Sequence, residues 1–267
     1  MRIPLDGGFR FRHMRKCIFC SGRAASKEDA WPLWLVRRFP TPQGVSVEAQ
    51  RREVPLPGWQ KSQHGITVRF VCAACNNGWM SRLETRAKPI VERLLVDPRV
   101  TLSPDEQMTL AVWTVKCAMV FEGLRDQPAW FYTEDDRRSF LESCTIPART
   151  VVWIAKCVAL PGIYCNATDH AESGSQTVDQ TRLYVTTVAF GPVALQVATA
   201  KPPPAIPAHV AITTEVRPGP WEDATDALWP KSTEVLVWPP RVVLNGELGL
   251  ETFHTRWGED HSPAAAV

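Results

Sequence analysis

The residues of this chain best suited to chemistry are two Cys-x-x-Cys pairs and the polar residues that follow them. The pairs are Cys17 with Cys20 and Cys72 with Cys75. Four thiolates in two such pairs are the usual ligand set of a closed, tetrahedral zinc site. The spacing therefore predicts one structural Zn²⁺, whose binding would supply on the order of 10 kcal/mol of folding free energy at neutral pH. The alternative is a pair of metal-free turns.

Charge is distributed unevenly along the chain, although the net charge is only +2. Residues 1–100 contain 18 Lys and Arg against 8 Asp and Glu, whereas residues 101–267 contain 12 against 20. A basic region that also carries a zinc site is typical of contact with nucleic acid, here expected to be double-stranded DNA. The alternative is a set of solvated arginines. The candidate phosphate contacts are Arg37, Arg38, Arg51, Arg52, Arg82 and Arg86.

The compartment is inferred from apolar runs and from cysteine usage. No stretch approaches the roughly 18 consecutive apolar residues that span a membrane, and Met1–Lys16 lacks the apolar core of a signal peptide. Cysteines in zinc spacing favour a reducing environment, so we expect a cytoplasmic protein. The four remaining cysteines lie among apolar residues and are predicted to be buried: Cys117, Cys144, Cys157 and Cys165.

The elements that would position the first set of residues form a module over 1–97. Trp31–Phe39 is predicted to be a short helix, residues 40–64 a loop, and Gly65–Cys72 a strand that leads into the second pair. From Asn76 onward apolar residues recur at three- and four-residue steps, which predicts a helix that Pro89 kinks or splits. With the first pair on a hairpin, the layout is a zinc-stapled, treble-clef-like ββα module.

Residues 98–258 are predicted to form an α+β domain with two helices and a mostly antiparallel sheet, followed by a loose tail over 259–267. Ser103-Pro104-Asp105-Glu106 is a strong helix start, and Thr133 caps a second helix. The predicted helices end near Gly123 and at Ser143. The predicted strands are Thr150–Val158, Arg182–Phe190, Val193–Thr199, His209–Val216 and Glu234–Trp238.

Two strings in the first module carry a family resemblance. KEDAWPLWL (27–35) followed by VCAACNNGWMSRLE (71–84) is similar to the zinc-stapled branch of the HNH (ββα-metal) endonuclease superfamily, which includes uncharacterised phage and actinobacterial proteins. The resemblance covers roughly residues 15–95. It implies that the four cysteines are structural zinc ligands and that Glu28 and Asn76 hold a divalent cation, Mg²⁺ or Mn²⁺. Such hard cations prefer carboxylate and amide oxygens.

The chain departs from the family at Asp29, where the family has the histidine that acts as general base. An aspartate is a much weaker base, because its reference pKa is about 3.9 against about 6.5 for histidine. General base catalysis is worth roughly 10²–10⁴ in rate, and much of it could be lost here. His64, just before the strand into the second pair, is the best substitute base in the sequence.

The resemblance implies a metal-dependent DNA endonuclease or nickase that has Asp29 in the general-base position. The departure leaves a second hypothesis open, a catalytically inactive HNH-like module that binds DNA. A third is a protein-interaction adaptor whose acidic second half meets a partner. Each functional role also has a purely structural alternative. Glu28 would then be an exposed acid at a helix cap. Three tryptophans would be core residues rather than platforms on which bases stack: Trp31, Trp34 and Trp79.

Overall fold

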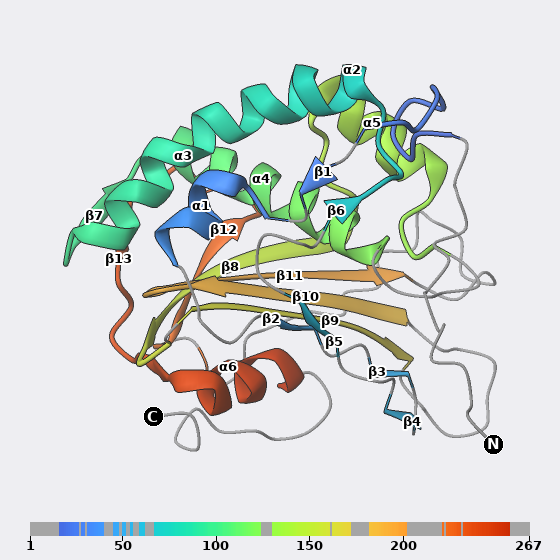
Figure 1. Ribbon diagram of the computed structural model, residues 1–267. Helices are drawn as coiled ribbons and strands as arrows, with labels where there is room; N and C mark the ends of the chain where they lie inside the picture. The colour runs from blue at the N-terminus through green and yellow to red at the C-terminus, as the bar shows by residue number, and fades with distance from the viewer. Residues whose placement is uncertain are drawn as a thin grey trace, which may run out of the picture.

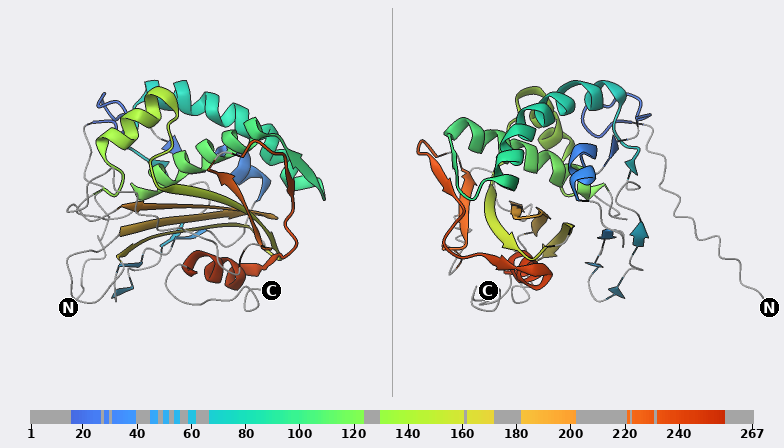
Figure 2. Two further views of the ribbon diagram at one scale, coloured as in Figure 1. Left: turned by 180° about the vertical axis from the view of Figure 1, so that it is seen from behind. Right: turned by 60° about the vertical axis from the view of Figure 1, so that its left-hand side comes forward.

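A central antiparallel sheet with helices on both faces organises the computed structural model (Figure 1). Helices α3, α4 and α5 lie over one face and α6 lies over the other, as the further views also show (Figure 2). This mixture of helices and antiparallel strands confirms the α+β class. The structure describes residues 16–26, 28–29, 31–39, 45–47, 50–51, 54–55, 59–61, 67–123, 130–160, 162–171, 182–201, 221, 223–230 and 232–256.

The elements before residue 97 are short, except for α3. β1 pairs antiparallel with β6, β2 with β5 and β3 with β4, so the expected loop over residues 40–64 contains short paired strands instead. In chain order the elements are β1 (Glu28–Asp29), α1 (Leu33–Arg38), β2 (Val45–Val47), β3 (Gln50–Arg51), β4 (Val54–Pro55), β5 (Trp59–Lys61), β6 (Thr67–Val68), α2 (Ala73–Cys75), the π-helical turn η2 (Asn76–Met80) and α3 (Ser81–Val96).

The helix predicted from Asn76 onward is present, and it is not split at Pro89. α3 continues through Pro89 to Val96. The non-helical backbone lies instead at Gly78, with φ −94° and ψ −107°, inside η2. Glycine tolerates such a conformation because it has no Cβ. The break therefore falls between the second cysteine pair and the long helix.

The main sheet has the strand order β12-β8-β11-β10-β9, and the short β14 pairs parallel with β8. Every other pairing in it is antiparallel, as the sequence predicts. A separate pair joins β7 (Val100–Leu102) to β13 (Leu236–Trp238). The strands of the main sheet are β8 (Thr150–Val158), β9 (Ile163–Ala171), β10 (Arg182–Phe190), β11 (Val193–Lys201), β12 (Thr225–Trp229) and β14 (Leu244–Asn245). The strand predicted over His209–Val216 and the tail predicted over 259–267 lie outside the described residues.

Both faces of this sheet are buried, and the two layers use different side chains. The cross-strand row Ile154, Leu195 and Val188 belongs to the large core cluster on the side of α4. The next row along the strands is Ala155, Ala194 and Ala189, and it packs with residues of α6. Successive side chains of a strand point to opposite faces, so in these two rows the larger residues face α4 and the alanines face α6.

Two helices of the second part were predicted with their caps. α4 (Pro104–Glu122) begins with a capping box between Ser103 and Glu106, and α5 (Glu134–Ser143) begins with one between Thr133 and Asp136. Fifteen residues of α4 are buried, so it is the central helix between α3 and the sheet. No helix in the described part of the chain is long and apolar enough to cross a membrane.

A third helix, α6 (Gly246–Thr255), corrects the prediction of two. Its sequence contains Gly246 and Gly249, which weaken helical propensity, and Asn245 makes no side-chain cap. The helix is stabilised by tertiary packing, because Leu250 and Phe253 are fully buried against the sheet. Packing of an apolar face is the main source of helix stability in proteins.

One cluster of buried side chains extends across the domain boundary expected near residue 97. It contains Trp31 and Leu35 of the first part together with Leu110, Leu195 and Trp238 of the second. The region around the cysteine pairs and the sheet therefore share a core. The division into a module over 1–97 and a domain over 98–258 stays a prediction.

Three of the four cysteines outside the two pairs are buried or half-buried, and one is exposed. Cys117 and Cys157 are buried and Cys165 is half-buried. Cys144 is exposed, which corrects the expectation that all four are core residues. It ends α5 in the left-handed conformation, with φ 54°, a position set by the helix terminus and not by side-chain burial.

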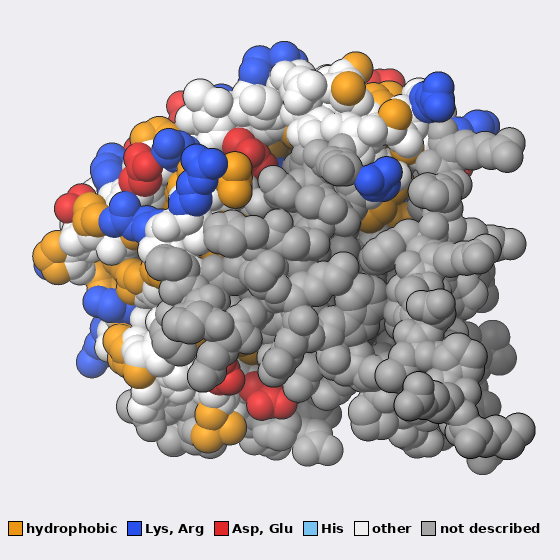
Figure 3. Space-filling model, in the orientation of Figure 1, with side chains coloured by type: hydrophobic (Ala, Val, Ile, Leu, Met, Phe, Trp, Pro, Cys, Tyr) orange, Lys and Arg blue, Asp and Glu red, His pale blue; other side chains and the backbone are white. Residues whose placement is uncertain are grey.

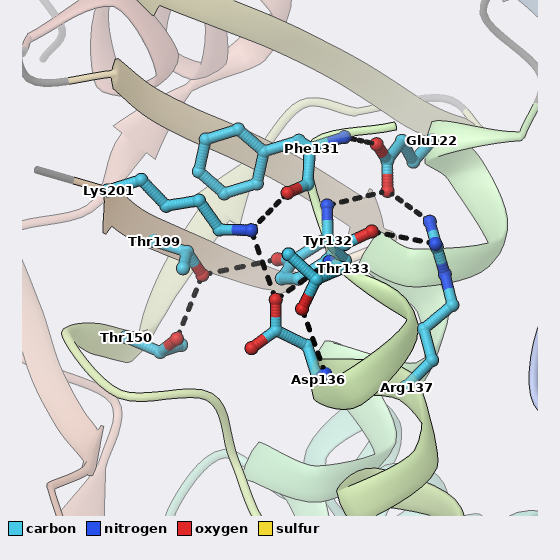
Figure 4. A network of polar contacts seen from close by, with 9 residues as sticks. All are labelled: Glu122, Phe131, Tyr132, Thr133, Asp136, Arg137, Thr150, Thr199 and Lys201. Atoms are coloured by element: carbon cyan, nitrogen blue, oxygen red, sulfur yellow. Dashed lines mark hydrogen bonds and ion pairs between the residues drawn. The ribbon is translucent and has the colours of Figure 1, made fainter. Parts of the chain in front are cut away.

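A buried polar network ties α5 to the end of α4 and to the sheet (Figure 4). The Glu122 carboxylate accepts hydrogen bonds from the backbone N–H groups of Phe131 and Tyr132 and pairs with the Arg137 guanidinium at 2.7 Å. Arg137 also donates to the Tyr132 carbonyl at 2.7 Å. The side chains of Glu122 and Arg137 are 1% and 3% exposed, so this ion pair is screened from water. Lys201 of β11 donates to the Phe131 carbonyl from the other side.

Candidate metal centre

The two cysteine pairs meet at one place. The Sγ atoms of Cys17, Cys20, Cys72 and Cys75 all lie within 4.8 Å of one another. Sγ of Cys20 lies 3.4 Å from Sγ of Cys72, across 52 residues of chain. The predicted convergence is therefore confirmed: these four thiols could hold one metal ion such as zinc.

The first pair lies on a tight turn. The N–H of Cys17 donates to the Gly22 carbonyl at 2.6 Å, and the N–H of Ser21 donates to the Cys17 carbonyl at 3.1 Å. Ser21 adopts the left-handed conformation, with φ 58°. At Gly22 a Cβ would come 3.3 Å from the Cys20 sulfur, so a side chain there would crowd the ligand. This turn, residues 17–22, is called the first knuckle below.

The second pair begins a helix. Cys72 is the cap of α2, and its sulfur accepts from the N–H of Cys75 at 3.4 Å, while the N–H of Asn76 donates to the Cys72 carbonyl at 2.9 Å. Backbone hydrogen bonds also hold the two pairs together. The N–H of Ile18 donates to the Phe70 carbonyl at 3.0 Å, and the N–H of Ser26 donates to the Val71 carbonyl at 3.2 Å.

Burial of three of the four thiols fits a sulfur-ligated metal. Cys17, Cys72 and Cys75 are buried, whereas Cys20 is exposed. Burial raises the pKa of the Cys75 and Cys20 thiols. For Cys72, hydrogen bonds from the Cys75 N–H and from the neighbouring thiols outweigh burial and lower its pKa. A bound cation would deprotonate all four, because the thiolate is the form that coordinates metal.

The predicted catalytic residues are placed to different extents. Glu28 and Asp29 form β1, where their backbones pair with Val68 and Thr67. Their side chains lie outside the described part of the structure. Asn76 is the first residue of η2, and its Nδ2 donates to the Ser26 hydroxyl at 2.8 Å. This bond fixes the amide of Asn76 against a residue that is only two positions before Glu28.

Ser26 is a contributor to the site that the sequence did not reveal. Its backbone N–H bonds to Val71 and its hydroxyl accepts from Asn76, so it connects the strand before the second pair to the residue after it. A serine in a run of small residues carries no distinctive signal. Its position shortly before Glu28 is the one clue that the sequence offers.

The candidate phosphate-binding arginines are spread over several elements. Arg37 and Arg38 are exposed at the end of α1, and Arg82 is exposed near the start of α3. Arg86 is exposed too, but it donates to the Thr109 hydroxyl at 3.0 Å. Figure 3 shows Lys and Arg side chains interspersed with acidic ones over the face formed by α1 and α3. The side chain of Arg51, and the whole of Arg52 and His64, lie outside the described residues.

No protein-family model, no curated protein and no solved structure matches this chain.

Proposed function

We propose that the chain is an HNH-like, metal-dependent DNA endonuclease or nickase. The observation that carries the proposal is the anchoring of Asn76 beside the approach to β1, directly after the second cysteine pair. β1 and β6 pair antiparallel, with α1 and β2–β5 between them in the chain, and α2 comes after β6. This layout of two paired strands and a helix supports the resemblance to that superfamily. A metal ion bound by the four cysteines would hold the two ends of this arrangement together.

In this proposal Glu28 and Asn76 hold one Mg²⁺ or Mn²⁺ ion, which supplies charge stabilisation at the scissile phosphate. Nδ2 of Asn76 donates to the Ser26 hydroxyl, and in this proposal the cation would be bound through the other end of the amide, Oδ1. By the resemblance, Asp29, next to Glu28 on β1, corresponds to the residue that would activate water. Exposed arginines at the start of α3 and the end of α1 would contact the DNA backbone.

Replacing Asn76 with alanine is expected to reduce nicking of supercoiled plasmid about 100-fold or more. The reason is that a metal ion contributes several kcal/mol to such a reaction, and each 1.36 kcal/mol is tenfold in rate. The assay is plasmid nicking with Mg²⁺, Mn²⁺ or Ni²⁺, with zinc content measured in the same preparations. Asn77→Ala is the matched control, because Asn77 is the exposed neighbour in the same turn. Equal activity in both variants, or no cleavage by the parent chain with any ion, would overturn the endonuclease.

The second candidate function is a catalytically inactive HNH-like module that serves as a DNA-binding or protein-interaction adaptor. The observation that favours it is Asp29, an acid where the superfamily has its base. Restoring the base with Asp29→His is then expected to raise the nicking rate by roughly 10²–10⁴. Asp29→Asn, which has no basic group, is the control. Cleavage that appears only in the histidine variant supports the inactive module, whereas a parent chain as fast as the variant argues against it.

A further inference from the structure

Three exposed basic residues border the cysteine cluster, and none of them was among the predicted DNA contacts. Lys16 directly precedes Cys17, Arg23 comes three residues after Cys20, and Arg69 comes three residues before Cys72. All three side chains are exposed. Three residues of chain span at most about 10 Å, so the backbone of each of these residues lies within roughly that distance of the backbone of a cluster cysteine.

Backbone pairing places these residues close to one another. Lys16 and Arg23 are direct partners in an isolated antiparallel bridge across the first knuckle. Arg69 adjoins Phe70, whose carbonyl accepts from Ile18 of the same knuckle at 3.0 Å. Like charges directly opposite each other in a strand pair are destabilising. The bridge between Lys16 and Arg23 therefore brings together two positive charges that repel each other.

The charges at this end of α3 differ from those at its other end. Lys88 pairs with Glu92, and Arg93 pairs with Glu106 at 2.6 Å. In the described part of the chain no carboxylate pairs with Lys16, Arg23, Arg69 or Arg82. Four thiolates with a bound zinc ion would carry a net charge of about −2, which offsets about two of these four positive charges and leaves an excess of roughly +2. A surface with unbalanced positive charge attracts polyanions.

We propose that Lys16, Arg23 and Arg69 form a knuckle surface that binds the phosphate backbone of duplex DNA. This inference rests on the nucleic-acid-directed part of the proposed function, and it adds a second contact region that continues from Arg82 on α3 around the metal centre. In Figure 1 the first knuckle lies beside α2, at the end of the helical layer where α3 begins. Cations arranged in this way position a DNA backbone and carry no base specificity.

The test is the salt dependence of binding to a fluorescent 20-base-pair duplex in EDTA-free buffer without Mg²⁺. Each phosphate contact contributes about 0.9 to the slope of log K against log salt, so Lys16→Gln/Arg23→Gln/Arg69→Gln is expected to lower the slope by about 2.7. Raising salt from 50 to 200 mM would then weaken the parent about 40-fold more than the variant. The matched control is Arg99→Gln/Arg138→Gln/Arg241→Gln, which removes three exposed cations elsewhere and is expected to keep the parent slope.

The outcomes separate this inference from the endonuclease itself. A triple variant with the parent slope overturns the knuckle surface, whether or not the parent cuts DNA. If that variant instead loses zinc while its slope is unchanged, the cations serve the thiolate cluster, and the inference is also overturned. A parent that binds with a reduced slope in the variant, but nicks nothing, supports the knuckle surface and removes the endonuclease alone.

Discussion

Cys75→Ser is expected to abolish zinc binding and to unfold the first part of the chain. The parent is expected to contain one zinc per chain, because the four sulfurs lie within 4.8 Å of one another. Zinc binding at such sites contributes on the order of 10 kcal/mol, comparable with the roughly 5–15 kcal/mol total stability of a domain. The measurements are zinc stoichiometry by elemental analysis and thermal unfolding by circular dichroism.

Cys144→Ser is the matched control for this experiment. Cys144 is exposed and lies outside the cluster, so its replacement is expected to keep both the zinc and the melting temperature. Treatment of the parent with a strong chelator should reproduce the effect of Cys75→Ser. A Cys75→Ser protein that keeps its full zinc content would show that the four thiols do not act as one site.

The second large effect is expected at Glu122, where alanine should lower the free energy of unfolding by about 3–5 kcal/mol. The substitution leaves the Arg137 guanidinium, 3% exposed, without its carboxylate. It also removes the acceptor for the N–H groups of Phe131 and Tyr132. Urea denaturation of the parent and the variant measures the difference.

Two further variants make this result specific. Glu122→Gln keeps an oxygen acceptor for a backbone N–H, so its cost should be smaller than that of alanine. Asp135→Ala breaks an exposed pair with Arg138, in which Asp135 is 89% exposed, and should change stability by less than about 1 kcal/mol. Equal losses at Glu122 and Asp135 would contradict the view that burial makes the Glu122 pair important.

The parts of the fold that the sequence predicted are those specified by short-range chemistry. Capping boxes at Ser103 and Thr133 involve residues three apart, and both helices begin where those residues indicate. α6 lacks such a signal and depends on contacts with a sheet that is distant in the sequence. β9 was missed because it includes Asn166 and Asp169, residue types that are depleted in strands, and it forms by pairing with the whole of β10.

In the candidate site, too, local patterns were predictable from the sequence and contacts between distant residues without such a pattern were not. The spacing of the cysteines is specific enough to predict that they converge on one metal centre. The role of Ser26 depends on two hydrogen bonds to residues 45 and 50 positions later, which no local pattern encodes. The same holds for the bridge between Lys16 and Arg23, since it exists because the first knuckle turns the chain back on itself.

The separation of the two cysteine pairs has a consequence for biosynthesis. Cys20 and Cys72 are 52 residues apart. At about 5–20 residues per second, a ribosome makes the second pair roughly 3–10 s after the first. During that interval the nascent chain offers a metal only half of its ligands, so tight capture of the ion has to wait for translation of α2. Tight metal binding would thus become possible once Cys75 is made, before translation of α4 and α5, the helices that complete the layer over the sheet.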